Sequence, residues 1–156
     1  MKREKTNAMR IFDSAKIAYD VLYYDIKATQ FDGLRVAEIL DIDPESSYKT
    51  LALKDKGDLI LAVIQLTHTL DVKKLNKVVD AKSVSMVQVK DQLTTVGHTR
   101  GSVTPIDVIV KHKMVFHSSI LSQEAIEISG GKMDVGLMVS SKDIISLLKA
   151  TVADIC

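Results

Sequence analysis

Apolar residues recur at three- and four-residue spacing in five segments of the chain, which is the period of an amphipathic helix. The pattern predicts helices at residues 6–16, 32–41, 72–79, 90–95 and 142–148. The segment 72–79 is typical of an amphipathic helix. Asp71 can cap it, and its apolar residues share one face while three lysines lie on the other. Ser140 or Ser141 can cap the last helix in the same way.

Shorter runs rich in β-branched and aromatic residues predict strands. They lie at residues 19–24, 48–53, 59–66, 84–87, 108–110, 114–117, 125–128 and 134–139. The loop 54–58 contains Gly57 and joins two of these runs, which indicates a β-hairpin. Residues 97–105 predict a loop and residues 129–132 a turn, because both hold glycines without periodicity. Strands outnumber helices and do not alternate with them, so we predict an α+β fold with a mixed, largely antiparallel sheet.

Length and composition predict a single domain spanning residues 1–156. The hydrophobic fraction of 46% and the charged fraction of 26% are those of a globular protein rather than a disordered one. Net charge is only +1 and aromatic residues make up 4%, which argues against an extended nucleic-acid-binding surface. A nucleic-acid partner would therefore be contacted over a small area, or be held by another protein.

The start of the chain is basic but is not followed by a long apolar run, so no signal peptide is predicted. The most apolar stretch, residues 59–64, is too short to cross a bilayer. The single cysteine, Cys156, excludes an internal disulfide and indicates a reducing compartment. We expect a cytoplasmic protein that has no membrane partner.

Conventional catalytic and metal-binding motifs are missing from the sequence. The histidines, at positions 68, 98, 112 and 117, show no ligand spacing, so no metal site is expected. Cys156 stands at a chain end that we expect to be mobile, which makes it a poor candidate nucleophile. Gly130-Gly131-Lys132 lacks the pattern of a phosphate loop, since Met133 stands where a Ser or Thr would bind magnesium. Gly97 and Gly101 allow a close backbone approach to a ligand, or belong to an ordinary loop.

Lys49 is unusual because it lies inside an apolar run that predicts a strand. Strand alternation places it on the same face as Leu51, which a simple solvent-facing lysine does not explain. The pattern alone leaves a structural and a functional role open.

Four segments, in this order and at this spacing, resemble the YbaK-type aminoacyl-tRNA deacylases. They are residues 45–51, 70–74, 97–105 and 128–132. These deacylases are free-standing relatives of the editing domain inserted in bacterial prolyl-tRNA synthetase. Each segment is a weak signal alone, but the likeness runs from about Thr6 to Leu148.

The resemblance implies a mixed sheet or barrel-like core surrounded by helices, with no cofactor. It identifies Lys49 as the essential residue that positions the charged 3′ end of tRNA, and Gly101 as a backbone contributor to catalysis. Tyr24, Thr50 and Ser129 are the implied substrate-binding residues. The family often has an acidic residue at the register of Gly136, and Asp134 is the candidate to replace it.

The implied reaction is hydrolysis of the ester that links a wrong amino acid, most often cysteine, to tRNA(Pro). An aminoacyl ester is already activated, and the cysteine thiol can attack its own carbonyl, so the site must mainly position the substrate and stabilise an oxyanion. The near-neutral charge is consistent with tRNA selection by a partner such as prolyl-tRNA synthetase. Two alternatives stay open, namely Ala-tRNA(Pro) editing by water attack and a non-catalytic aminoacyl-tRNA-binding module.

Overall fold

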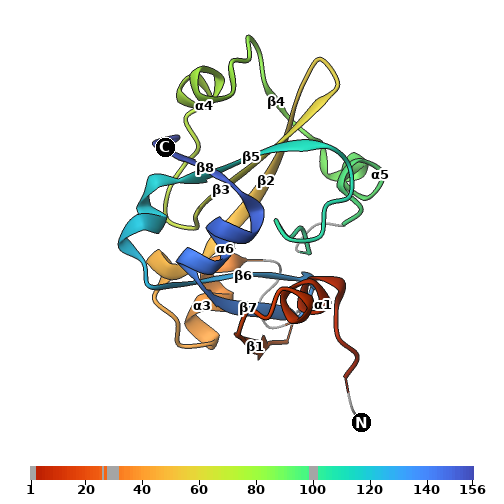
Figure 1. Cartoon of the computed structure of the whole chain (residues 1–156), viewed down its shortest axis with the longest axis vertical. Helices are drawn as coiled ribbons and strands as arrows, with labels where there is room; N and C mark the ends of the chain where they lie inside the picture. The colour runs from red at the N-terminus through yellow and green to blue at the C-terminus, as the bar shows by residue number, and fades with distance from the viewer. Residues whose placement is uncertain (1–2, 26, 28–31, 99–101) are drawn as a thin grey trace.

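The computed structural model describes residues 3–25, 27, 32–98 and 102–156, and its centre consists of two β-sheets (Figure 1). The helices are α1 (Asn7–Ser14), α3 (Gly33–Ile39), α4 (Val72–Val79), α5 (Gln92–Val96) and α6 (Ser141–Leu148). The strands are β1 (Tyr19–Tyr23), β2 (Tyr48–Asp55), β3 (Asp58–Gln65), β4 (Ser85–Met86), β5 (His112–His117), β6 (Ala125–Lys132), β7 (Val135–Ser140) and β8 (Thr151–Ala153). Short 3-10 turns are η1 (Pro44–Ser46), η2 (Val89–Asp91) and η3 (Ser118–Ser122).

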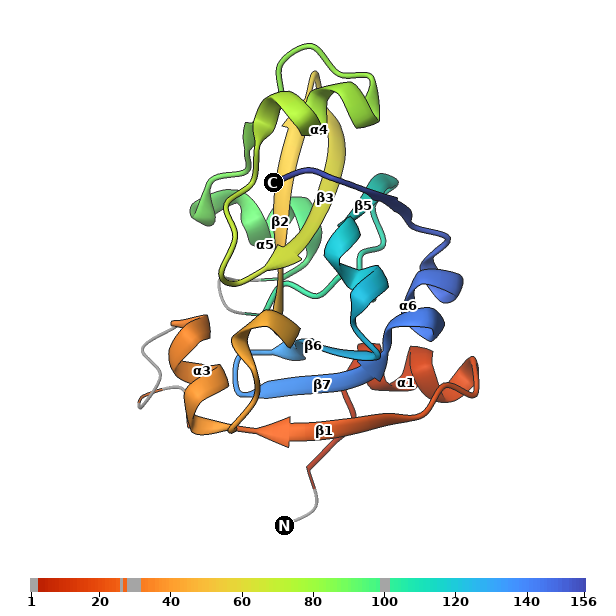
Figure 2. The same cartoon turned by 90° about the vertical axis from the view of Figure 1, so that its left-hand side faces the viewer.

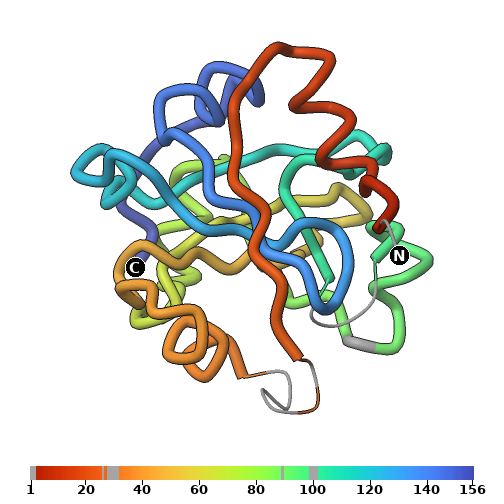
Figure 3. The backbone as a smooth tube through the Cα atoms, turned by 90° about the horizontal axis from the view of Figure 1, so that it is seen from below, coloured from red at the N-terminus to blue at the C-terminus, as the bar shows by residue number. Residues whose placement is uncertain are grey.

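One sheet has three antiparallel strands in the order β1-β7-β6, and β1 crosses in front of the other two in Figure 3. The other has five strands in the order β4-β2-β3-β5-β8. Its β2–β3 pair is antiparallel, whereas β3, β5 and β8 run parallel to one another. The expected α+β class with mixed, largely antiparallel sheets is therefore confirmed.

The predicted hairpin is formed by β2 and β3, which pair from Tyr48↔Gln65 to Asp55↔Asp58. Lys56 and Gly57 at its tip have φ values of 50° and 89°. Two consecutive residues with positive φ are the mark of a type I′ turn, whose twist matches that of the strands it joins. A parallel bridge between Ser47 and Glu127 joins the chain just before β2 to the three-stranded sheet. Figure 2 shows the start of β2 close to β6.

Buried apolar side chains form three core clusters, and the first includes residues of both sheets. It joins α1 and α6 to β6 and β7, and Phe12, Ile128, Leu137 and Ile144 are fully buried there. The second lies between α4 and the hairpin, where Leu75 of α4 contributes a fully buried side chain. This second cluster holds α4 over one face of the five-stranded sheet (Figure 2).

Two predicted elements differ from the structure, and one observed strand was not predicted. Residues 108–110 are not a strand, because the chain there is irregular and Ile109 is 95% exposed. Residues 129–132 are not a turn, because β6 continues to Lys132 and the reversal falls at Met133 and Asp134. The short β8 was not predicted, since three residues carry too little periodicity to identify a strand.

The predicted N-caps of two helices are confirmed. The Asp71 carboxylate accepts the backbone N–H groups of Lys73 and Lys74, and the Ser140 hydroxyl accepts that of Asp143. Each cap satisfies N–H groups that have no partner within the helix. Among the described residues, no helix has the length and apolarity needed to cross a membrane.

Candidate functional site

Strand alternation divides the three-stranded sheet into a core face and a polar face. On β6, Ile126 and Ile128 belong to the first core cluster, and Glu127 and Ser129 therefore point the other way. Ser129 pairs with Gly136 on β7, which puts Gly136 on the side opposite the core residues of that strand. The polar side chains of this sheet thus gather on one face.

Lys49 lies near the point where β2 meets the three-stranded sheet. Ser47, two residues before Lys49, forms a parallel bridge with Glu127, so the start of β2 lies beside β6. Tyr48 is in the first core cluster, so Lys49 points to the opposite side of β2, the side of Leu51. We call Glu127, Ser129 and Gly136 the polar face.

The Lys49 side chain is half-buried on β2, opposite Ile64. Among the described residues, no hydrogen bond or ion pair holds its ammonium group. The Lys49 charge acts on the Cys156 thiol. Burial and the charge of Asp154 raise the pKa of this thiol, and the charges of Lys74 and Lys49 lower it by less. Lys49 therefore carries a positive charge that is not paired with a carboxylate of the described chain.

Tyr24 lies at the edge of the polar face. Its backbone N–H donates to the Asp134 carbonyl oxygen at 3.1 Å, which extends the β1–β7 ladder by one residue. Burial raises the pKa of the Tyr24 phenol to about 12, and the charges of Glu127 and Asp134 add to the shift. The phenol therefore stays protonated at working pH and is a hydrogen-bond donor beside two carboxyl groups.

Glu127 is the site residue that sequence analysis missed. Its side chain is buried at 8% exposure, and burial raises its pKa to about 7, against a smaller lowering effect of the Ser47 hydroxyl. A carboxyl group that titrates near neutrality can take up and release a proton during a reaction. Its position between two buried isoleucines in the alternating run Ala125-Ile126-Glu127-Ile128 looked like that of an ordinary solvent-facing residue.

Asp134 belongs to the turn between β6 and β7 and is less buried than Glu127. One carboxylate oxygen pairs with Arg3 at 3.5 Å, and the side chain is 32% exposed. The other oxygen, Oδ1, is buried and has no hydrogen-bond partner among the described residues. Its negative charge acts on the Tyr24 phenol, so Asp134 lies at the same edge as Tyr24.

A hydrogen bond orients the Ser129 hydroxyl beside a bulge in β6. Its hydroxyl oxygen accepts the backbone N–H of Gly131 at 3.2 Å, and a bulge lies between Ser129 and Lys132. Gly131 has φ of 89°, which a side chain would disfavour, so the glycine permits the bulge. A Cβ atom at Gly131 would lie 3.5 Å from Thr104 and 3.8 Å from His98, so both flanks of the 97–105 loop come close to this bulge. Gly101, within that loop, lies outside the described residues.

Thr50 is on the other side of β2. It neighbours Lys49 in the chain, and alternation turns its side chain toward the face of Tyr48 and Ala52, which is occupied by core residues. The Thr50 hydroxyl therefore lies on the opposite face of β2 from the Lys49 side chain.

A shallow hollow of about 560 Å³ lies elsewhere, lined mainly by α1 with Asp107 and Leu147 beside it. It shares no residue with the polar face. The hollow therefore does not define the site that the sequence resemblance implies.

Residues 34–147 match the family model described as the aminoacyl-tRNA editing domain. This match covers most of the chain, including the hairpin that carries Lys49 and the β6–β7 pair that carries Glu127 and Ser129. The chain belongs to the aminoacyl-tRNA editing domain family. It is accordingly an aminoacyl-tRNA hydrolase that acts on the charged end of tRNA, as the resemblance implied.

One relative of this editing domain is similar in sequence, and two solved structures are similar in fold. A protein of Enterococcus faecalis named "Putative Cys-tRNA(Pro)/Cys-tRNA(Cys) deacylase EbsC" is 30% identical over 154 residues, covering 98% of this chain and 94% of that protein. The crystal structure of "a putative trans-editing enzyme for prolyl tRNA synthetase" has a TM-score of 0.84 at 15% identity, covering 97% of this chain and 98% of that one. That of "hypothetical protein APE2540" has a TM-score of 0.86 at 20% identity, covering 94% of this chain and 97% of that one. The two crystal structures bear on the fold alone.

Proposed function

We propose that this editing domain hydrolyses Cys-tRNA(Pro) in trans, with the thiol of the bound cysteine as nucleophile. The observation that carries the proposal is the buried Glu127 carboxyl, with its pKa near 7, at the bridge to Ser47, two residues before Lys49 of β2, whose ammonium group is unpaired among the described residues. The relative named as a Cys-tRNA(Pro)/Cys-tRNA(Cys) deacylase supports the choice of cysteine. The role in translation favours a cytoplasmic location.

Glu127 is the general base of the proposed reaction. Its carboxylate takes the proton of the substrate thiol, whose ordinary pKa of about 8.5 is close enough for transfer. The thiolate forms an S–C bond with the ester carbonyl, and the C–O bond to the terminal ribose breaks. Glu127 returns the proton to the ribose oxygen, and water then opens the resulting cysteine thiolactone.

Lys49 and Tyr24 stabilise the charge that develops in this step. A fixed ammonium group is suited to the carbonyl oxyanion or to the terminal phosphate, and a protonated phenol adds a hydrogen bond. Ser129 and Asp134 line the substrate-binding site, and the family resemblance assigns the Gly101 backbone to catalysis. Cys156, the thiol of the protein itself, is a weaker nucleophile, because burial raises the pKa of this thiol.

A deacylation assay on four substrates tests this proposal. The substrates are Cys-tRNA(Pro), Ala-tRNA(Pro), Cys-tRNA(Cys) and tRNA(Pro) charged with 2-aminobutyrate, which replaces the cysteine thiol by a methyl group. We expect rapid loss of Cys-tRNA(Pro) and at least a 100-fold slower loss of the 2-aminobutyryl ester. Comparable rates for cysteine and 2-aminobutyrate would contradict thiol assistance and favour water attack.

The same assay separates the alternatives. Faster hydrolysis of Ala-tRNA(Pro) than of Cys-tRNA(Pro) would identify an alanine editor, in which Glu127 activates water. Tight binding of charged tRNA without hydrolysis would identify a binding module. Adding prolyl-tRNA synthetase tests the proposed partner, since a net charge of +1 gives the isolated domain little means to select tRNA. We expect the synthetase to increase discrimination between tRNA(Pro) and tRNA(Cys).

A further inference from the structure

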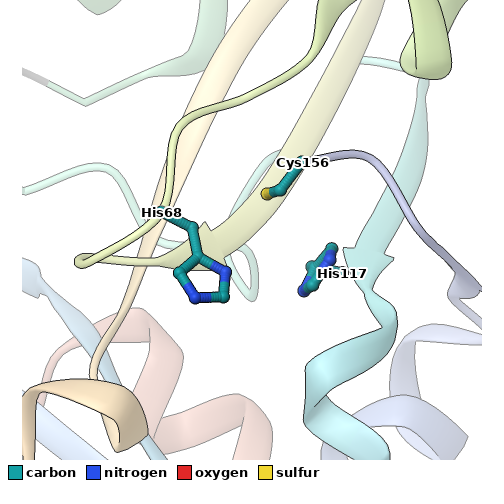
Figure 4. Close-up of side chains that lie close together, drawn as sticks. All are labelled: His68, His117 and Cys156. Atoms are coloured by element: carbon teal, nitrogen blue, oxygen red, sulfur yellow. The ribbon is translucent and has the colours of Figure 1, made fainter.

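His68, His117 and Cys156 come together at one edge of the five-stranded sheet (Figure 4). One ring nitrogen of each histidine and the Cys156 sulfur all lie within 4.8 Å of one another. The two imidazole rings have centroids 5.6 Å apart and are nearly perpendicular, at 80°. Three potential metal ligands from distant parts of the sequence thus converge on one point.

The parallel strands β3, β5 and β8 explain this convergence. They are neighbours in the sheet, so their carboxyl ends lie at the same edge. His117 is the last residue of β5, His68 follows the end of β3 at Gln65, and Cys156 follows the end of β8 at Ala153. Sequence spacing could not identify this group, because its members are brought together by the sheet and not by a local motif.

Each side chain of the cluster is oriented by a neighbour. His117 is 11% exposed, and its Nδ1 accepts the Ser119 N–H at 3.2 Å while Nε2 lies 3.3 Å from Asp154. His68 Nε2 lies 3.8 Å from a Glu45 carboxylate oxygen. Carboxylates beside ligating histidines are the usual outer partners of a metal site, because they fix the ring and increase its basicity.

The segment that carries Cys156 is also held in place. Lys74 of α4 donates to the Cys156 carbonyl oxygen at 2.7 Å and to the Asp154 carboxylate at 2.9 Å. The other oxygen of Asp154 accepts the Cys156 N–H at 3.3 Å. Cys156 is therefore positioned by both main-chain and side-chain contacts, contrary to the expectation of a mobile end.

We propose that His68, His117 and Cys156 form a binding site for a zinc-class divalent ion. Two imidazoles and a thiolate are the ligand types that Zn²⁺ favours, and three protein ligands leave a fourth position for water or a nearby carboxylate. Bonds of about 2.0 to 2.3 Å bring tetrahedral ligand atoms to about 3.5 Å from one another, so the cluster must contract by about an ångström. His68, with 37% of its side chain exposed, has room to rotate inward.

Binding changes two contacts in a defined way. The thiol loses its proton to solvent as the sulfur–metal bond forms, and the ion takes the place of one of the two partners of the His117 ring. The bound ion then ties the ends of β3, β5 and β8 to one another. This inference does not depend on the proposed deacylation.

Cobalt binding tests the site, because Co²⁺ replaces Zn²⁺ and reports a bound thiolate by a sulfur-to-metal charge-transfer band. We expect the chelator-treated full chain to take up one equivalent of Co²⁺ with this band, and Zn²⁺ to displace it. Cys156→Ser, a nearly isosteric change, should abolish the band, and His68→Ala should weaken binding at least tenfold. His112→Ala is the matched control, since this histidine is outside the cluster, and its affinity should equal that of wild type.

Thermal unfolding supplies a second readout. Zn²⁺ should raise the Tm of wild type and of His112→Ala but not that of Cys156→Ser, since an ion that binds the folded state stabilises it. Absence of the charge-transfer band in folded wild type would overturn the proposal. Equal affinity of wild type, Cys156→Ser and His68→Ala would overturn it as well, since the ion would then be bound elsewhere.

Discussion

The carboxylate of Glu127 fills the space above Gly136 on the neighbouring strand. A Cβ atom at residue 136 would lie 2.5 Å from Glu127 Oε1, a distance at which one of the two groups must move. The absence of a side chain at Gly136 is therefore what allows Glu127 to adopt this position. The family that this chain resembles often has an acidic residue at the position of Gly136. We infer that Glu127 takes the place of that residue from the adjacent strand, and that Asp134 lines the substrate-binding site instead.

Gly136→Ala should impair both activity and stability. The added methyl group displaces the Glu127 carboxylate, and overpacking of this kind lowers the free energy of unfolding by about 1–3 kcal/mol. The displaced base should lower kcat/KM for Cys-tRNA(Pro) at least tenfold, because misplacement by about an ångström is costly in catalysis. Urea unfolding and the deacylation assay measure the two effects.

An exchange of side chains tests whether the carboxyl group itself matters. Glu127→Ala alone should lower kcat/KM by about 10²–10⁴, the contribution of a general base. Adding Gly136→Asp to this variant returns an acid to the same space, so activity should recover at least tenfold. A double variant no more active than Glu127→Ala would contradict the inferred replacement.

Lys49→Ala should remove most activity while leaving the fold intact. Loss of a charged group that stabilises the developing oxyanion costs about 10²–10³ in kcat. Lys54→Ala is the matched control, because Lys54 is an exposed lysine on the same strand, and its activity should be that of wild type. Full activity of Lys49→Ala, with the Tm of both variants unchanged, would refute the role assigned to this residue.

The hairpin and its lysine could be predicted because their signals are local. The positive-φ turn at Gly57 and the apolar runs on each side identify both strands, and alternation identifies Lys49 as facing away from Tyr48. Glu127 could not be identified in this way. Its pKa is raised by burial, and its side chain fits beside Gly136 of the neighbouring strand, a tertiary relationship that no local pattern reveals.

The misassigned turn shows a second limit of sequence analysis. Gly130-Gly131 carries the composition of a chain reversal, yet β7 pairs with β6 on both sides of these residues, from Ser129↔Gly136 to Lys132↔Val135. The glycine at positive φ produces a bulge instead. Whether such a glycine ends a strand or bends it depends on the partner strand, which is a tertiary interaction.

Thr50→Val should leave deacylation nearly unchanged. The resemblance assigns Thr50 to the substrate, but its side chain lies on the opposite face of β2 from Lys49. A valine of the same shape removes the hydroxyl and keeps the backbone, so we expect less than about a threefold change in KM. An increase of tenfold or more in KM, with kcat unchanged, would show that the hydroxyl binds substrate.

Glu127 should also make stability depend on pH. Its pKa is about 7 in the folded protein and 4.5 as the ordinary value, so the unfolded chain loses this proton first as pH rises. Between these two values the folded state binds more protons than the unfolded state, and the free energy of unfolding falls with rising pH, by about 3 kcal/mol in total. Above about pH 7 both states are ionised and this contribution no longer changes.

Glu127→Gln isolates this dependence, because the amide keeps the shape and does not titrate. Urea unfolding of both proteins from about pH 4.5 to pH 8 should give a difference, wild type minus variant, that declines through this range and then levels off. The kcat/KM of wild type for Cys-tRNA(Pro) should rise over the same range, as the carboxylate forms, while the variant stays low throughout. A stability difference independent of pH would mean that the pKa of Glu127 in the folded protein is its ordinary value. Glu127 would then not be a general base that titrates near neutrality.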